Sequence, residues 1–113
     1  MAIPSCTKVA GFPCHKYIMK IIAIEKVILG VSPEDIKPFL VEETKKVWEF
    51  YQAGIIREIY FTENNDAILI LEAKDNEEAL GIIRQLPLVQ NNLIEFIIHE
   101  MHPYRGYARL FGD

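Results

Sequence analysis

The chain has 113 residues, enough for one domain with its own core but too few for two. Half of the residues are hydrophobic, so we expect some apolar surface to lie against another subunit. A net charge of −4 excludes a broad electrostatic attraction to nucleic acid or to anionic membranes. The longest apolar runs are strand-sized and no apolar signal segment opens the sequence, so we expect a cytoplasmic protein that does not enter membranes.

Residues 1–16 mix proline, glycine, serine and cysteine without periodicity, which predicts a flexible N-terminal arm. Cys6 and Cys14 do not form a CxxC pair, and free thiols are their ordinary interpretation in a cytoplasmic protein. Cys14 and His15 have no further cysteine or histidine nearby to complete a metal site. We therefore predict no metal there.

A run rich in isoleucine and valine at residues 17–29 predicts the first strand. Ser32 and Pro33 then form a helix start, with serine as the cap and proline in the first helical position. Because a proline inside a helix removes a hydrogen bond, Pro38 predicts a short turn at 33–36 and a main helix that begins near Lys37.

The main helix is expected to present one broad apolar face and to end at Gly54 in a left-handed cap. The apolar face consists of Leu40, Val47, Trp48 and Tyr51.

The second half of the chain predicts a hairpin, a helix and a last strand. Two strand-like runs at 55–62 and 67–73 enclose an Asn-Asn-Asp turn, which is typical of a hairpin. A helix capped by Asp75 or Asn76 is expected at 75–86, and a strand at 93–101. The order is β-α-β-β-α-β, so residues 17–103 are expected to form a ferredoxin-like α+β domain. Its antiparallel sheet should carry two helices on one face.

Both faces of the predicted sheet are apolar, because successive residues of a strand point to opposite sides. Ile22 and Ile24 share one face of the first strand, while Ile21 and Ala23 share the other. Two helices cover only one face, so we expect the other face to pack on the sheet of a second copy. The expected partner is therefore a homo-oligomer, at least a dimer.

An apolar corner at residues 86–89, Leu-Pro-Leu-Val, joins the second helix to the last strand. Loops are usually polar, so another part of the structure should cover this corner. Two interpretations remain open: the corner lies against neighbouring chain segments in the assembly, or it plugs the core of its own monomer.

The sequence resembles the muconolactone isomerase-like family of the dimeric α/β-barrel superfamily, most clearly in its motifs after Gln52. The similar motifs are "FYQAGIIREIYF", "DNEEALGIIRQLPLV" and the His-Pro of "MHPY", and the resemblance spans roughly residues 19–103. It implies a barrel closed by two subunits. It also implies a proton shift on a small anionic lactone, without metal or cofactor.

That chemistry needs an acid/base group and a cation for a carboxylate. We assign the catalytic role to His99, Glu25 and Glu58, and substrate binding to Arg57 and Tyr60, with Glu25, Glu58, Tyr60 and His99 expected on the barrel interior. Histidine is the usual proton-transfer group at neutral pH. The ordinary alternatives stay open: a satisfied core histidine, a surface ion pair for Arg57, and rim hydrogen bonds for Glu25, Glu58 and Tyr60.

Two further motifs have ordinary interpretations. In "HEMH" the histidines are three residues apart on a strand and point to opposite faces, so we predict no zinc site. Residues 104–113 alternate aromatics with arginines, as RNA-binding surfaces do, but the chain is acidic and its third strand lacks the RNA-recognition signature. We expect an arm that crosses to a neighbouring subunit, and no nucleic-acid partner.

Three functions are compatible with these patterns. The first is a cofactor-independent enzyme that acts on a small organic acid or lactone. The second is a ligand-binding or assembly module without chemistry, and the third is a cofactor-free monooxygenase with the same topology.

Overall fold

The computed structural model describes residues 18–112, so the expected N-terminal arm, with Cys6 and Cys14, lies outside the described residues. The strands are β1 (Met19–Val27), β2 (Ile56–Phe61), β3 (Ala67–Ala73) and β4 (Ile94–Met101). The helical segments are α1 (Pro33–Ile36), η1 (Lys37–Phe39), α2 (Leu40–Gln52), α3 (Asn76–Ile83), α4 (Pro87–Gln90) and η2 (Gly106–Phe111). No helix in this part of the chain is long and apolar enough to cross a membrane.

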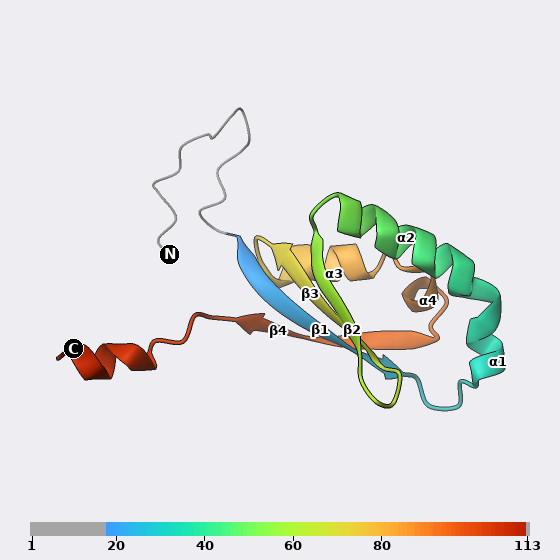
Figure 1. Ribbon diagram of the computed structural model, residues 1–113. Coiled ribbons are helices and arrows are strands. Elements are labelled where there is room, and N and C mark those ends of the chain that lie inside the picture. Colours follow the sequence, from blue (N-terminus) through green and yellow to red (C-terminus); the bar gives the residue numbers. More distant parts are fainter. Residues whose placement is uncertain (1–17, 113) are drawn as a thin grey trace.

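The four strands form one antiparallel sheet in the order β2-β3-β1-β4 (Figure 1). The predicted hairpin is present, because β2 and β3 pair directly and Asn65 adopts a left-handed conformation, with φ of 63°, in the turn between them. β1 and β2 run parallel with β3 between them, and β3 and β4 run parallel with β1 between them. The expectation of an α+β fold with a four-stranded antiparallel sheet is confirmed.

Prolines divide the helical segments. α1 covers the predicted turn at 33–36, and Pro38 lies in η1, a 3-10 turn, because a proline cannot donate the hydrogen bond that a continuous α-helix would require. α2 therefore begins at Leu40, three residues later than expected. Pro87 has the same effect at the apolar corner: α3 ends at Ile83, and residues 87–90 form a separate helical turn, not a loop.

The end of α2 follows the sequence prediction closely. Gly54 has a φ of 79°, in the left-handed region that favours glycine. Its N–H donates to the Tyr51 carbonyl, and the N–H of Ile55 donates to the Phe50 carbonyl, which completes a Schellman motif. The motif turns the chain back so that β2 starts directly beneath the helix.

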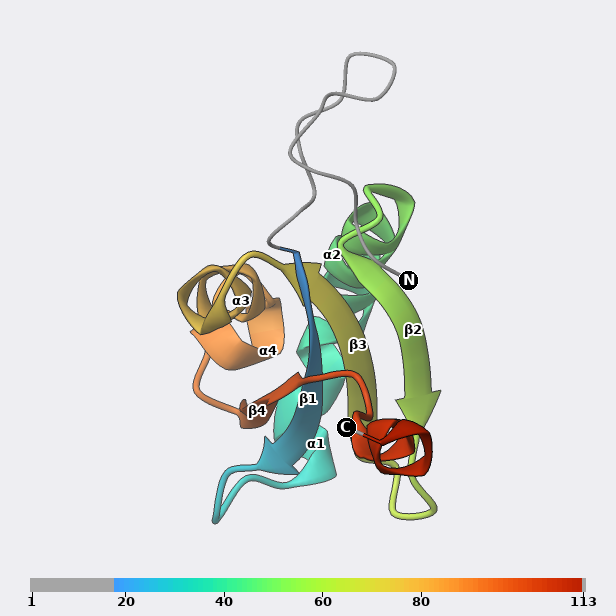
Figure 2. The same ribbon diagram turned by 90° about the vertical axis from the view of Figure 1, so that its left-hand side faces the viewer.

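The hydrophobic core lies between one face of the sheet and the helices α2, α3 and α4 (Figure 2). Ile21 and Leu71, which pair across β1 and β3, are fully buried at its centre. The helices contribute Phe50 from α2 and Ala79, Ile82 and Ile83 from α3.

The apolar corner belongs to this core. Leu86 is 1% exposed and Leu88 is also buried, while Val89 packs against the same cluster. A single copy of the chain therefore covers the corner, and the second of the two interpretations, a plug for the monomer's own core, is confirmed. The Glu43 carboxylate accepts a hydrogen bond from the Leu88 N–H (3.0 Å), which ties α2 to α4.

The expected apolar face of α2 is only partly correct. Val47 and Phe50 pack against the core, but Leu40, Trp48 and Tyr51, on the adjoining part of the helix surface, are about half exposed. The apolar face of α2 is therefore broader than the part that residues 18–112 cover.

Candidate functional site

The second face of the sheet carries three of the predicted site residues. No helix of residues 18–112 packs on this open face, which comprises the side chains of Ile22, Ile24, Ile68, Ile70, Ile97, Glu58, Tyr60 and His99. Glu58 pairs with Ile70, Ile70 with Ile22, and Ile22 with His99, so these four residues form one row across the sheet.

The row separates two proposed catalytic groups. Glu58 lies on edge strand β2 and His99 on the opposite edge strand β4, three strand spacings apart. At about 4.8 Å per spacing, their backbones are roughly 14 Å apart. Within one copy of the chain, Glu58 and His99 are therefore too far apart to contact each other directly.

Glu58 is already paired on its own strand. The Tyr60 hydroxyl donates to the Glu58 carboxylate (2.8 Å), and this hydrogen bond raises the pKa of the Tyr60 hydroxyl, helped by the negative charge of Glu58. Both side chains are exposed. The hydrogen bond and the exposure agree with the ordinary alternative for these residues, in which Glu58 and Tyr60 are polar partners at the rim of the sheet.

Arg57 lies at an irregularity of β2. The register shifts between Ile56 and Glu58, so the strand bulges at Arg57 and its guanidinium reaches Glu72 of β3, with 3.9 Å between Nε and the carboxylate. The pair is partly exposed and contributes little to stability.

Glu25 lies on the other face of the sheet, which corrects the expectation that it shares the barrel interior with Glu58 and His99. By strand alternation it follows Ile21 and Ala23 on the helix-covered side, and its carboxylate accepts a hydrogen bond from the Ala67 N–H (2.7 Å) at the start of β3. Arg57 is at the opposite end of β3, beside Glu72, about 17 Å away along the strand. The predicted set is therefore spread over four places: Glu58 with Tyr60, His99, Arg57 and Glu25.

A carboxylate that sequence reasoning missed lies near Glu25. Glu43 projects from α2 toward the sheet and is half-buried, like Glu25. Burial raises the pKa of the Glu43 carboxyl, the hydrogen bond from Leu88 opposes this, and the charge of Glu25 raises it further. Burial likewise raises the pKa of Glu25, against its hydrogen bond from Ala67 and with help from the charge of Asp66.

The signal for Glu43 was present in the sequence. Glu43, Val47 and Phe50 are spaced by four and three residues, so they share one face of the helix. A carboxylate in line with two core residues is unusual, because burial of a charge costs free energy. The spacing therefore indicated a carboxyl group at the edge of the core.

The other titratable groups do not assemble into a metal centre. His102 lies beyond the end of β4, with Nε2 3.7 Å from the Glu100 carboxylate. Among the residues that the structure describes, no group of three or more His, Cys, Asp or Glu side chains is placed to hold a metal ion.

Comparisons with known proteins do not assign the chain to a family. No protein-family model matches it, and no curated protein is significantly similar to it. The resemblance to muconolactone isomerase therefore rests on the quoted motifs alone.

Proposed function

We propose that this protein is a small, cofactor-independent enzyme that moves a proton on a small organic acid or lactone, with Glu25 and Glu43 as its acid/base pair. The observation that supports this proposal is the pair itself: two half-buried carboxyl groups, close enough for one charge to affect the other, both with raised pKa values. Raised carboxyl pKa values are common at sites of acid/base catalysis.

The chemistry needs one carboxyl group in each protonation state. Migration of a double bond in a lactone removes a proton from one carbon atom and adds a proton to another. The carboxylate of the pair takes up the first proton, and the carboxylic acid donates the second. Each group ends in the other's starting state, so the pair keeps one proton and the reaction needs no co-reactant.

Proton exchange tests this proposal. A panel of unsaturated lactones and carboxylic acids would be incubated with the protein in heavy water, and deuterium uptake and double-bond migration followed by NMR. We expect Glu25→Gln and Glu43→Gln each to lower the rate by about 10²- to 10⁴-fold, the usual contribution of a general acid or base. Glu63→Gln, which changes an exposed carboxylate in the hairpin turn, is the matched control and should keep the full rate.

Two results would overturn the enzyme proposal. One is wild-type protein that promotes exchange with no member of the panel. The other is activity that survives in both Glu25→Gln and Glu43→Gln.

The open face favours a second candidate, an assembly module. We infer a ferredoxin-like fold from the two split parallel strand pairs, and a dimer in which the open faces of two copies pack together. The isoleucines of this face are partly exposed, and Ile97 is 47% exposed. A two-fold axis along the strands would set the β2 edge of one copy over the β4 edge of the other. Glu58 of one copy would then face the His99 imidazole of the second copy.

A charge in the centre of the open face tests the dimer. Ile22→Lys should lower the mass measured by light scattering about twofold at a concentration where wild type associates, because the interface would bury two unpaired ammonium groups. Leu29→Lys, at a fully exposed position in the turn after β1, is the control. An unchanged mass in Ile22→Lys would exclude this interface.

A further inference from the structure

Charged side chains border the open face of the sheet at both ends. Lys20 of β1 pairs with Glu72 of β3 at one end, and Lys26 of β1 pairs with Glu95 of β4 at the other. By strand alternation, Lys20 and Lys26 point to the same side of the sheet as the isoleucines of β1 that lie between them. An apolar centre with a polar rim is the usual composition of a protein interface.

Lys20 lacks a partner for its charge. It is exposed, and among residues 18–112 it takes part in no ion pair. Its cross-strand neighbour Glu72 contacts Arg57 instead, with 3.9 Å between the Arg57 Nε and the carboxylate. The Glu72 carboxylate is partly exposed and has two oxygens, so it can accept a second cation. This end of the sheet therefore offers an unpaired cation beside a carboxylate that is only partly used.

A dimer through the open face can have one of two symmetries. Aligned sheets keep their strands within about 30° of each other and pack about 10 Å apart. A two-fold axis between them then runs either along the strands or across them. An axis along the strands, through the centre of the order β2-β3-β1-β4, keeps each residue at its own end and sets β3 over β1 and β2 over β4. An axis across the strands sets each strand over its own copy and exchanges the two ends.

The two axes bring different charges together. With the axis along the strands, Lys20 of one copy faces Glu72 of the second copy, and Glu58 faces His99, because each pair lies on exchanged strands at one level of the sheet. With the axis across the strands, Lys20 faces Lys26, since both lie on β1 at equal distances from the centre of the isoleucines. Like charges that face each other across an interface oppose association.

We propose that two copies pack open face to open face about a two-fold axis along the strands, with Lys20 of each copy paired to Glu72 of the other. The proposal rests on the open-face dimer inferred above and selects its symmetry. The second copy supplies the missing partner of Lys20. It also sets His99 opposite Glu58, two groups that a single copy holds at opposite edges of its sheet. The open face is therefore complementary in charge to a second copy of itself.

Charge reversal distinguishes the two axes. Lys20→Glu and Glu72→Lys each put like charges at both Lys20–Glu72 contacts of the proposed dimer, so each should raise the dimer dissociation constant about tenfold or more. Analytical ultracentrifugation at low ionic strength measures this constant, and about 1 M salt should shrink the difference because salt screens exposed charges. With the axis across the strands, Lys20→Glu would instead face Lys26 and lower the dissociation constant.

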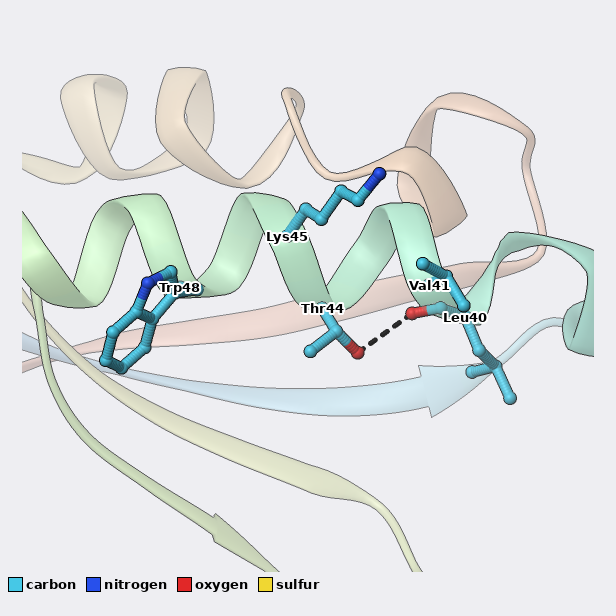
Figure 3. Close-up of a pocket in the computed structure, with 5 residues that line it drawn as sticks. All are labelled: Leu40, Val41, Thr44, Lys45 and Trp48. Carbon is cyan, nitrogen blue, oxygen red and sulfur yellow. Dashed lines mark hydrogen bonds between the residues drawn. The ribbon is translucent and has the colours of Figure 1, made fainter.

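An equal mixture of the two variants shows whether the contact is between copies. The Lys20→Glu copy carries two glutamates at this end of the sheet and the Glu72→Lys copy carries two lysines, so both contacts between them are attractive. The mixture should therefore regain the affinity of wild type. Mixing cannot repair a folding defect within each chain, since the cross-strand neighbours there remain alike in charge. Lys45→Glu, which reverses an exposed lysine of α2 (Figure 3), controls for net charge and should match wild type.

Several outcomes would overturn the proposal. Lys20→Glu that associates as well as wild type, or better, excludes the axis along the strands. A mixture that stays dissociated excludes the contact between Lys20 and Glu72. A monomeric wild type excludes the dimer itself and leaves residues 1–17 or solvent as the cover of the open face. Ile22→Lys separates these failures: if it dissociates the protein and Lys20→Glu does not, the open faces associate about another axis.

Discussion

Replacing Leu86 with alanine is expected to lower the free energy of unfolding by about 2–5 kcal/mol, the range for deletion of a buried leucine side chain. Leu86 is 1% exposed and belongs to the cluster that holds Ile21, Leu71 and Ile83. The loss combines the transfer free energy of the removed methyl groups with the cavity they leave between α3, α4 and the sheet. Domains of this size are stable by only about 5–15 kcal/mol, so the effect is large.

Denaturant unfolding followed by circular dichroism measures this change. Leu29→Ala is the matched control: the same substitution at a fully exposed leucine should stay within about 0.5 kcal/mol of wild type. All proteins should be compared at one concentration, because association would stabilise the folded state by mass action. A loss below about 1 kcal/mol for Leu86→Ala would mean that the corner does not belong to the core of its own monomer.

The second large effect is an increase in stability at neutral pH when Glu25 and Glu43 are both replaced by glutamine. Burial raises the pKa of both carboxyl groups in the folded protein above the ordinary value of 4.5. The folded state therefore binds these protons more tightly than the unfolded state. The stability that the protonated groups contribute is fully present below pH 4.5 and is lost as the pH rises through the raised values.

Glu25→Gln/Glu43→Gln should therefore have a higher free energy of unfolding than wild type near pH ~8, and the difference should shrink to nothing at acidic pH. The amide oxygens can still accept the hydrogen bonds from Ala67 and Leu88. Asp35→Asn is a control of opposite sign, because hydrogen bonds from the Ser32 N–H and hydroxyl lower the pKa of the Asp35 carboxyl. That variant should lose stability at neutral pH and match wild type only at low pH.

A double variant that is less stable than wild type at neutral pH would contradict the raised pKa values. The same double variant can be measured for both stability and proton transfer. A variant that gains stability at neutral pH while it loses proton transfer would show that the ionised carboxylates are kept for chemistry at the expense of the fold.

Local features of the fold could be predicted from short stretches of sequence. Ser32 and Pro33 at the start of α1, Gly54 after α2 and the Asp75 cap of α3 all lie where their side chains or backbone conformations predicted them. The alternation along β1 likewise predicted that Ile21 and Ile22 lie on opposite faces. Each of these features depends on a few consecutive residues.

The candidate site could not be predicted in the same way. Glu58 and His99 were grouped because each lies on a strand with the right alternation, yet the order β2-β3-β1-β4 puts them at opposite edges of the sheet. Glu25 and Glu43 are eighteen residues apart in the chain, and the charge of one reaches the other only because α2 folds back over the sheet.

The amino-acid sequence by itself therefore determined the four strands, the two main helices, several of their caps and the two-sided character of the sheet, since backbone geometry and side-chain periodicity act over one or two turns or a few strand residues. Only the tertiary structure decided which strands are neighbours, which part of the apolar face of α2 meets the core and which carboxyl groups lie close together. Those outcomes depend on how segments distant in sequence pack, because Glu43 faces the core and Trp48 faces outward from the same amphipathic helix.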